Sequence, residues 1–129
     1  MEIIAEGSEG TILLVDDDED MLAVIAAHLR DWGFRPITAA SGEDAFEKFG
    51  KQDFVLVITD CMMPGMTGLE LALLIAQLDG PPVIIESGDS DIADRVKAAG
   101  VHATCLTKPV DPDVLRATID GMLHSSAIH

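Results

Sequence analysis

The residues of this sequence that could do chemistry are mostly acidic, and they follow short apolar runs. Asp16 and Asp17 follow TILLV, Asp60 follows FVLVIT, Ser87 ends PVIIES, and Lys108 comes directly after ATCLT. Carboxylates that lie close together repel one another unless a cation neutralises them, and Mg²⁺ prefers hard oxygen ligands. The set therefore predicts a magnesium site in which Asp17 and Asp60 bind the ion and Asp16 orients a metal-bound water.

The same residues could support phosphoryl transfer. A carboxylate accepts a phosphoryl group when a metal ion and a cationic side chain hold the phosphoryl oxygens, because the transfer depends on positioning and charge neutralisation. Lys108 could pair with one phosphoryl oxygen, and Ser87 could donate a hydrogen bond to another. Taken singly, each residue has a simpler role as a cap, a turn residue or a solvated charge. Their common position after apolar runs favours one shared site.

Five predicted strands, alternating with helices, must position these residues. Several of the runs are apolar at every position, which is typical of strands covered on both faces. Strands joined by single helices form a parallel sheet through right-handed crossovers, and ligands bind beyond the carboxyl ends of such strands. The fold class is therefore α/β with the order (βα)₅, and the strands are predicted at 11–15, 35–39, 54–59, 82–87 and 103–107.

Capping residues indicate where the helices begin and end. Asp18 is placed to cap the first helix, and the apolar segment 67–78 is predicted to be helical. Gly100 is placed to end the fourth helix, while Asp111 and Pro112 resemble the N-cap and first position of the fifth. Each helix is thus predicted to begin soon after a strand ends.

Length and composition fit one globular domain. The chain has 129 residues, of which 48% are hydrophobic and 24% charged, and its mean hydropathy is positive, which favours a packed interior over disorder. We expect a domain over residues 11–123, an N-terminal extension over 1–10 and a C-terminal tail over 124–129.

The charge balance and the apolar pattern exclude several classes of function. A net charge of −15 would repel a nucleic-acid backbone, so direct nucleic-acid binding is not expected. The sequence has neither a signal-peptide pattern nor an apolar run of about 18 residues, so we expect no membrane span and a cytoplasmic location. Cys61 and Cys105 are too few and too separated for a disulfide framework or a zinc cluster.

Four segments carry a specific resemblance. The segments VDDDED (15–20), TDCMMPGMTG (59–68), IIESG (84–88) and LTKP (106–109) are similar to the signature segments of response-regulator receiver domains. The resemblance covers about residues 11–123. It implies a flavodoxin-like fold with strand order 2-1-3-4-5. It also implies a function: a receiver of a two-component system that accepts a phosphoryl group and is a signalling module, not an enzyme acting on other substrates.

Carried over residue by residue, the resemblance implies the metal site and the acceptor. Asp60 would be the phosphorylated aspartate, Asp16 and Asp17 would form the acidic pair, and the backbone carbonyl of Met62 would complete the metal shell. Mg²⁺ is the expected ion, with Mn²⁺ as an alternative. The expected partners are a sensor histidine kinase or a histidine phosphotransfer protein upstream, and a downstream protein or output domain.

The resemblance also assigns a switch and exposes two departures. Ser87 would be the switch hydroxyl and Lys108 the family's lysine, followed by a cis peptide bond to Pro109. Cys105 stands where many relatives carry Tyr or Phe, and Glu86 stands where relatives usually have an apolar residue. With Cys105, the chain lacks the aromatic side chain that, in the family, turns inward on phosphorylation and passes on the signal. With Glu86, it has a charge beside Ser87.

Alternative functions rest on weaker patterns. Asp16 and Asp18 are spaced like the nucleophile and acid of a haloacid-dehalogenase-type phosphatase, although that family wants Thr or Val where this chain has Asp20. A second alternative is a non-phosphorylated interaction module on the same fold. The chain is either a stand-alone receiver or a domain of a longer regulator or hybrid kinase.

Overall fold

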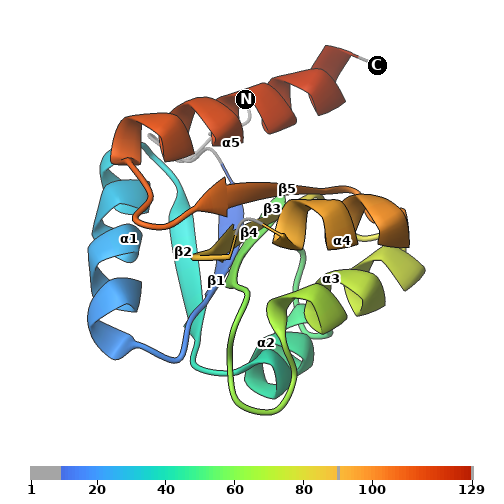
Figure 1. The fold of residues 1–129 in the computed structure, drawn as a ribbon. Helices are drawn as coiled ribbons and strands as arrows, with labels where there is room; N and C mark the ends of the chain where they lie inside the picture. The colour runs from blue at the N-terminus through green and yellow to red at the C-terminus, as the bar shows by residue number, and fades with distance from the viewer. Residues whose placement is uncertain (1–9, 90, 129) are drawn as a thin grey trace.

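Five parallel strands form one sheet in the order β2-β1-β3-β4-β5 (Figure 1). This is seen in a computed structural model that describes residues 10–89 and 91–128. The predicted flavodoxin-like fold and strand order are therefore confirmed. The strands are β1 (Thr11–Val15), β2 (Arg35–Ala39), β3 (Leu56–Asp60), β4 (Val83–Ser87) and β5 (Ala103–Thr107).

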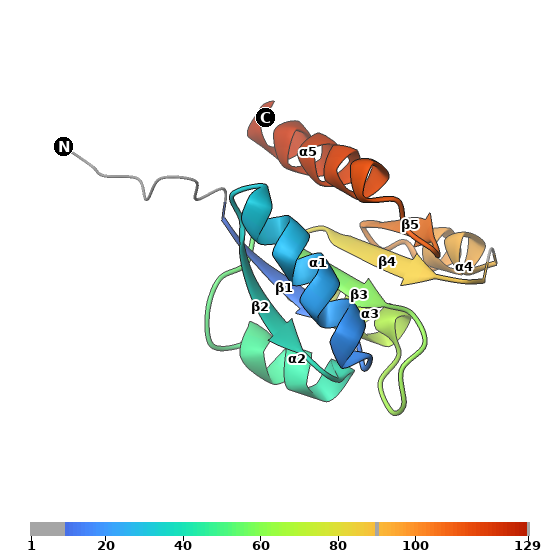
Figure 2. The same ribbon diagram turned by 90° about the vertical axis from the view of Figure 1, so that its left-hand side faces the viewer.

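Five helices cover both faces of the sheet (Figures 1 and 2). Alternate strand residues such as Ile12 and Leu14 pack against α1 and α5, while Leu13 and Val15 pack against α2, α3 and α4. This two-sided burial explains why the central strands are apolar at every position. The helices are α1 (Glu19–Asp31), α2 (Gly42–Phe49), α3 (Gly68–Gln77), α4 (Ile92–Ala99) and α5 (Pro112–Ile128).

The capping residues predicted from the sequence have the expected roles. The Asp18 carboxylate accepts hydrogen bonds from the first turn of α1. Gly100 ends α4 in the left-handed conformation at φ 73°, which glycine adopts without steric cost. Asp111 Oδ1 accepts a hydrogen bond of 2.7 Å from the backbone N–H of Asp113, and α5 begins at Pro112. Asp18 and Asp111 thus begin their helices close to the carboxyl edge of the sheet, whereas Gly100 ends α4 shortly before β5 begins at the opposite edge.

Two strand boundaries differ from the prediction. The strand predicted over 54–59 begins at Leu56, which pairs with Ile12 of β1, and the preceding Val55 contributes one hydrogen bond of 2.9 Å from its N–H to the Thr11 carbonyl oxygen. The strand extends to Asp60, so the acidic residue is part of β3. The strand predicted from residue 82 begins at Val83, since Pro82 has no N–H to donate to a ladder.

The ends of the chain were predicted to lie outside the domain. Residues 1–9 of the expected extension 1–10, and residue 129 of the expected tail, are outside the described residues. The helix α5 continues through Ile128, so the boundary placed after residue 123 falls within a helix. Among the described residues, no helix is both long and apolar enough to cross a membrane. The cytoplasmic location stays a prediction.

Candidate functional site

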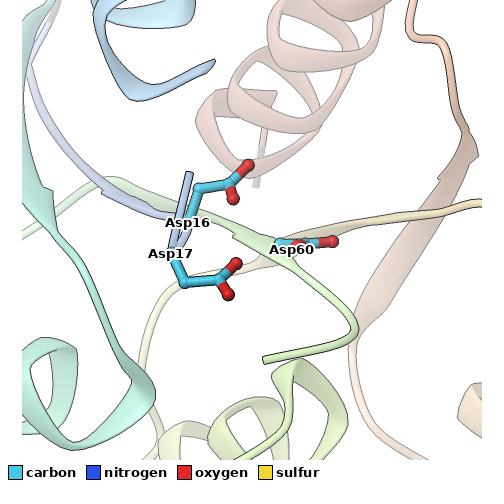
Figure 3. A group of neighbouring side chains, drawn as sticks. All are labelled: Asp16, Asp17 and Asp60. Carbon is cyan, nitrogen blue, oxygen red and sulfur yellow. The ribbon is translucent and has the colours of Figure 1, made fainter. Parts of the chain in front are cut away.

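Three aspartates lie together at the carboxyl edge of the sheet (Figure 3). Val15 of β1 pairs with Thr59 of β3, so Asp16, which follows β1, and Asp60, which ends β3, lie at the same level of the sheet. Asp17 follows in the loop, and one carboxylate oxygen from each aspartate lies within 4.8 Å of the others. The two aspartates that the sequence assigned to the metal, together with the predicted orienting residue Asp16, therefore form one cluster.

The three carboxylates differ in burial. Asp16 is 3% exposed and Asp60 is 7% exposed, whereas Asp17 is open to solvent. Burial raises the pKa of Asp16 above its usual value; a hydrogen bond from the Asp18 N–H opposes this rise, and the charge of Asp60 adds to it. Two buried carboxylates and one exposed carboxylate form an anionic site that opens to water on the Asp17 side.

Lys108 supplies a positive charge to this site. Its Nζ donates a hydrogen bond of 2.8 Å to Asp60 Oδ1. Burial lowers the pKa of Lys108, but the bond to Asp60 and the nearby acidic charges outweigh burial and raise that pKa above its usual value. The backbone of Lys108 also donates to the Ser87 carbonyl oxygen at 2.8 Å, and its peptide bond to Pro109 is cis. Lys108 is thus fixed at the site by both its backbone and its side chain.

Ser87 lies at the same edge of the sheet, and its hydroxyl faces its own loop. Ser87 is the last residue of β4 and is 2% exposed. Its Oγ accepts a hydrogen bond of 2.9 Å from the Asp89 N–H and lies 3.3 Å from the Asp89 carbonyl oxygen, to which it can donate. The structure therefore brings Ser87 to the predicted edge with its hydroxyl engaged in the turn after β4.

The loop after Asp60 folds back over the end of β3. The N–H of Gly68 donates to the carbonyl oxygen of Cys61 at 2.8 Å. A Cβ on Gly68 would overlap the Asp60 carbonyl oxygen, so glycine is needed where α3 begins this close to the strand. Met62 lies in this loop with its side chain 69% exposed. Gly68 was not among the residues predicted to be functional, although its place in the TDCMMPGMTG segment was a signal.

Glu86 is the charged residue whose importance the sequence only partly revealed. It pairs with Asp60 in the β3–β4 register and is 2% exposed. Burial raises its pKa to about 7. Its charge beside Ser87 was visible in the sequence, but its complete burial was not, because burial depends on the helices that pack over the sheet.

A family model and known relatives agree with this geometry. The model of the response regulator receiver domain matches residues 12–120. This chain belongs to that family. The receiver domain therefore serves two-component signal transduction, and this assignment disfavours the phosphatase alternative built on Asp16 and Asp18. In the structure the Asp18 carboxylate caps α1.

The curated relatives are longer than this receiver domain. It is 39% identical over 119 residues to the transcriptional regulatory protein GlrR of Escherichia coli, and the match covers 90% of this chain and 27% of GlrR. It is 35% identical over 127 residues to the virulence sensor protein BvgS of Bordetella pertussis, and this match covers 91% of this chain and 10% of BvgS. The chain thus spans only a small part of each.

Solved structures have the same fold over nearly their whole length. A receiver domain protein from Clostridium thermocellum has a TM-score of 0.83 at 27% identity, with 92% of this chain and 97% of that chain covered. The response regulator TrrA from Thermotoga maritima, solved in complex with Mg²⁺ and BeF, has a TM-score of 0.79 at 30% identity. That match covers 88% of this chain and 98% of TrrA.

Proposed function

We propose that Asp60 accepts a phosphoryl group while a divalent cation is held by Asp16, Asp17, Asp60 and the backbone carbonyl of Met62. The observation that carries this proposal is the cluster itself, in which oxygens of three carboxylates lie within 4.8 Å of one another. Lys108 stands 2.8 Å from Asp60 Oδ1. This arrangement has the anionic ligands for a cation and a positive charge beside the acceptor carboxylate.

The donor set fits Mg²⁺, with Mn²⁺ as a substitute. All the side-chain ligands are hard carboxylate oxygens, and Mg²⁺ is commonly bound by one or two carboxylates and several waters. The exposure of Asp17 leaves room for those waters. The similarity to TrrA, which was solved with Mg²⁺ and BeF, supports the same ion here. When bound, the cation would neutralise negative charge on the phosphoryl oxygens.

The chain's own residues would orient the reaction. An Asp60 oxygen would form a bond to phosphorus as the phosphorus–nitrogen bond of the donor's phosphohistidine breaks and its imidazole leaves, and Lys108 can move its hydrogen bond from Asp60 to a phosphoryl oxygen that develops charge. Ser87 would turn its hydroxyl from the Asp89 carbonyl to another phosphoryl oxygen. That rotation would release the turn after β4, so phosphorylation would change the loop that precedes α4. In this way the receiver domain would catalyse only its own phosphorylation and dephosphorylation.

The partners follow from the same chemistry. The phosphoryl donor would be a phosphohistidine on a sensor histidine kinase or a histidine phosphotransfer protein. The signal would pass to a downstream protein or output domain, as expected from a module found within longer proteins such as GlrR and BvgS.

Labelling with acetyl phosphate tests the acceptor and the metal together. We expect one acid-stable, base-labile phosphoryl group by mass spectrometry, only with Mg²⁺ or Mn²⁺ present, and none in Asp60→Asn. Asp53→Asn is the matched control, because Asp53 is exposed in the loop that precedes β3, at the far end of that strand from Asp60. Label that persists in Asp60→Asn contradicts the assignment. Absence of label in the native chain, with the fold intact, would favour the non-phosphorylated interaction module.

A further inference from the structure

A cavity of about 490 Å³ lies between α1, α5 and the ends of β4 and β5. Its walls are largely apolar and include Met21, Val24, Val110 and Leu115. Its volume falls in the range of small-molecule sites, which typically combine apolar walls with a few polar groups. The cavity lies on the side of the sheet that α1 and α5 cover, whereas the loop carrying Met62 leads to α3 on the other side.

The acidic group that lines this cavity is Glu86, and His28 and Lys108 are the other ionisable residues in its lining. Along β4, Glu86 has the same orientation as Ile84, which packs against the α1 and α5 side of the sheet. Glu86 is 98% buried, and within the described part of the chain its Oε2 has no hydrogen-bond partner. A buried carboxylate oxygen without a donor costs free energy, so native proteins seldom retain one without a ligand or water.

The charges around Glu86 favour a cationic partner. The Lys108 ammonium acts on the Glu86 carboxyl, and so do the negative charges of Asp60, at the end of the neighbouring strand β3, and of Asp16, which follows β1, the strand beyond β3. Lys108 also lines the cavity, but its Nζ is bonded to Asp60 Oδ1 at 2.8 Å. The local balance is therefore three carboxyl groups to one ammonium group, which attracts a second cation and repels an anion.

We propose that this cavity binds a compact apolar molecule that carries one protonated amine, with the Glu86 carboxylate as the anchor for the amine. The apolar body would contact Val24, Val110 and Leu115, and the ammonium group would donate a hydrogen bond to Glu86 Oε2. Charge-assisted hydrogen bonds to a buried carboxylate are among the stronger polar contacts. This site shares Lys108 with the phosphoryl-transfer site, but binding the amine requires neither a metal ion nor a phosphoryl group, so it is tested without metal and without a phosphoryl donor.

Phenethylamine is a suitable probe, because it joins an aromatic ring to a primary amine by a short chain. We expect saturable amide NMR shifts for residues of α1, α5 and the end of β4, with a Kd on the order of 1 mM for a ligand of this size. Phenethyl alcohol, of nearly the same shape but uncharged, should bind about tenfold more weakly. The titrations are made in EDTA at about pH 8, where Glu86 is mostly ionised.

Three variants separate the anchor from the walls. Glu86→Gln keeps the shape of the side chain. It should weaken the binding of phenethylamine at least tenfold and leave the affinity for phenethyl alcohol nearly unchanged. Val24→Trp, at an exposed position on the cavity rim, should block both probes without touching Glu86. Glu47→Gln is the control, because Glu47 is an exposed glutamate on α2, on the opposite side of the sheet. Thermal melts establish that each variant is folded.

The outcomes are decisive in both directions. The proposal is supported if Glu86→Gln loses affinity for phenethylamine but not for phenethyl alcohol. Equal affinities for the amine and the alcohol, or an unchanged amine affinity in Glu86→Gln, would overturn it, as would the absence of saturable shifts. The last result would mean that Glu86 is satisfied by buried water alone.

Discussion

Lys108 Nζ lies 2.8 Å from Asp60 Oδ1, and this pair joins the ends of β5 and β3 across the intervening strand β4. The two residues are 48 positions apart in the sequence. The lysine side chain is 32% exposed and the aspartate side chain is 9% exposed, so the pair lies at the boundary between core and solvent. Lys108 thus acts as an internal counter-ion for the aspartate cluster.

Lys108→Met should lower stability and strengthen cation binding at once. Methionine retains much of the apolar stem but removes the charge, so the three aspartates lose their counter-ion. In EDTA we expect the free energy of unfolding to fall by about 2 kcal/mol, a cost between those of breaking an exposed and a fully buried ion pair. Urea denaturation with and without Mg²⁺ measures both effects. A smaller Mg²⁺-induced stabilisation than in the native chain would contradict this role.

Asp17→Asn should stabilise the protein when no divalent cation is present. Asp17 is exposed and its carboxylate lies within 4.8 Å of two others, so neutralising it relieves roughly 1 kcal/mol of repulsion in a largely aqueous medium. The melting temperature in EDTA should therefore rise. Mg²⁺ should then stabilise this variant much less than the native chain. Equal Mg²⁺-induced shifts in the two proteins would remove Asp17 from the metal site.

Glu86 should make the protein less stable as the pH rises from 4.5 to about 7. Burial raises its pKa from 4.5 to about 7, so within this window the folded protein retains a proton that the unfolded chain has lost. The stabilisation is complete below pH 4.5 and is lost as the pH passes through about 7. Between these two limits, the contribution of Glu86 to the free energy of unfolding changes by an amount on the order of 3 kcal/mol.

Comparison with Glu86→Gln isolates this contribution from those of the other acids. Urea midpoints measured in EDTA across this range should fall with pH in the native chain more steeply than in the variant, because Gln does not titrate. Above the Glu86 pKa the variant should be the more stable protein. Parallel pH profiles would show that Glu86 keeps an ordinary pKa.

Cys105→Ala should leave the phosphorylation response nearly intact. Cys105 is half-buried on the side of the sheet covered by α4, and its thiol is too small to change exposure as an aromatic ring would. Hiding about 50 Å² of a ring contributes roughly 1 kcal/mol, which Cys cannot match. Phosphorylation-induced amide NMR shifts of α4 and α5 should stay within about twofold of the native values.

Ser87→Ala is the comparison for this variant. It removes the hydroxyl that would turn from Asp89 to the phosphoryl group, so the same shifts should largely disappear. If Cys105→Ala uncoupled the response as strongly as Ser87→Ala, the thiol would be part of the switch.

The sequence alone determined the fold and the edge at which the site lies. Apolar runs without alternation predicted strands buried on both faces, and the caps at Asp18, Gly100 and Asp111 fixed the helix ends. Both signals are local, because strand burial and helix capping depend on residues only a few positions apart. The shared edge then followed from the parallel topology, which places every strand's carboxyl end on the same side.

The tertiary structure decided which side chains actually meet. The bond between Lys108 and Asp60, the engagement of the Ser87 hydroxyl with Asp89, and the burial of Glu86 beneath α1 and α5 all depend on register and helix packing. The sequence could name these residues as neighbours of one edge. It could not assign their distances or the desolvation of Glu86, because both arise from elements far apart in the chain and brought together only when it folds.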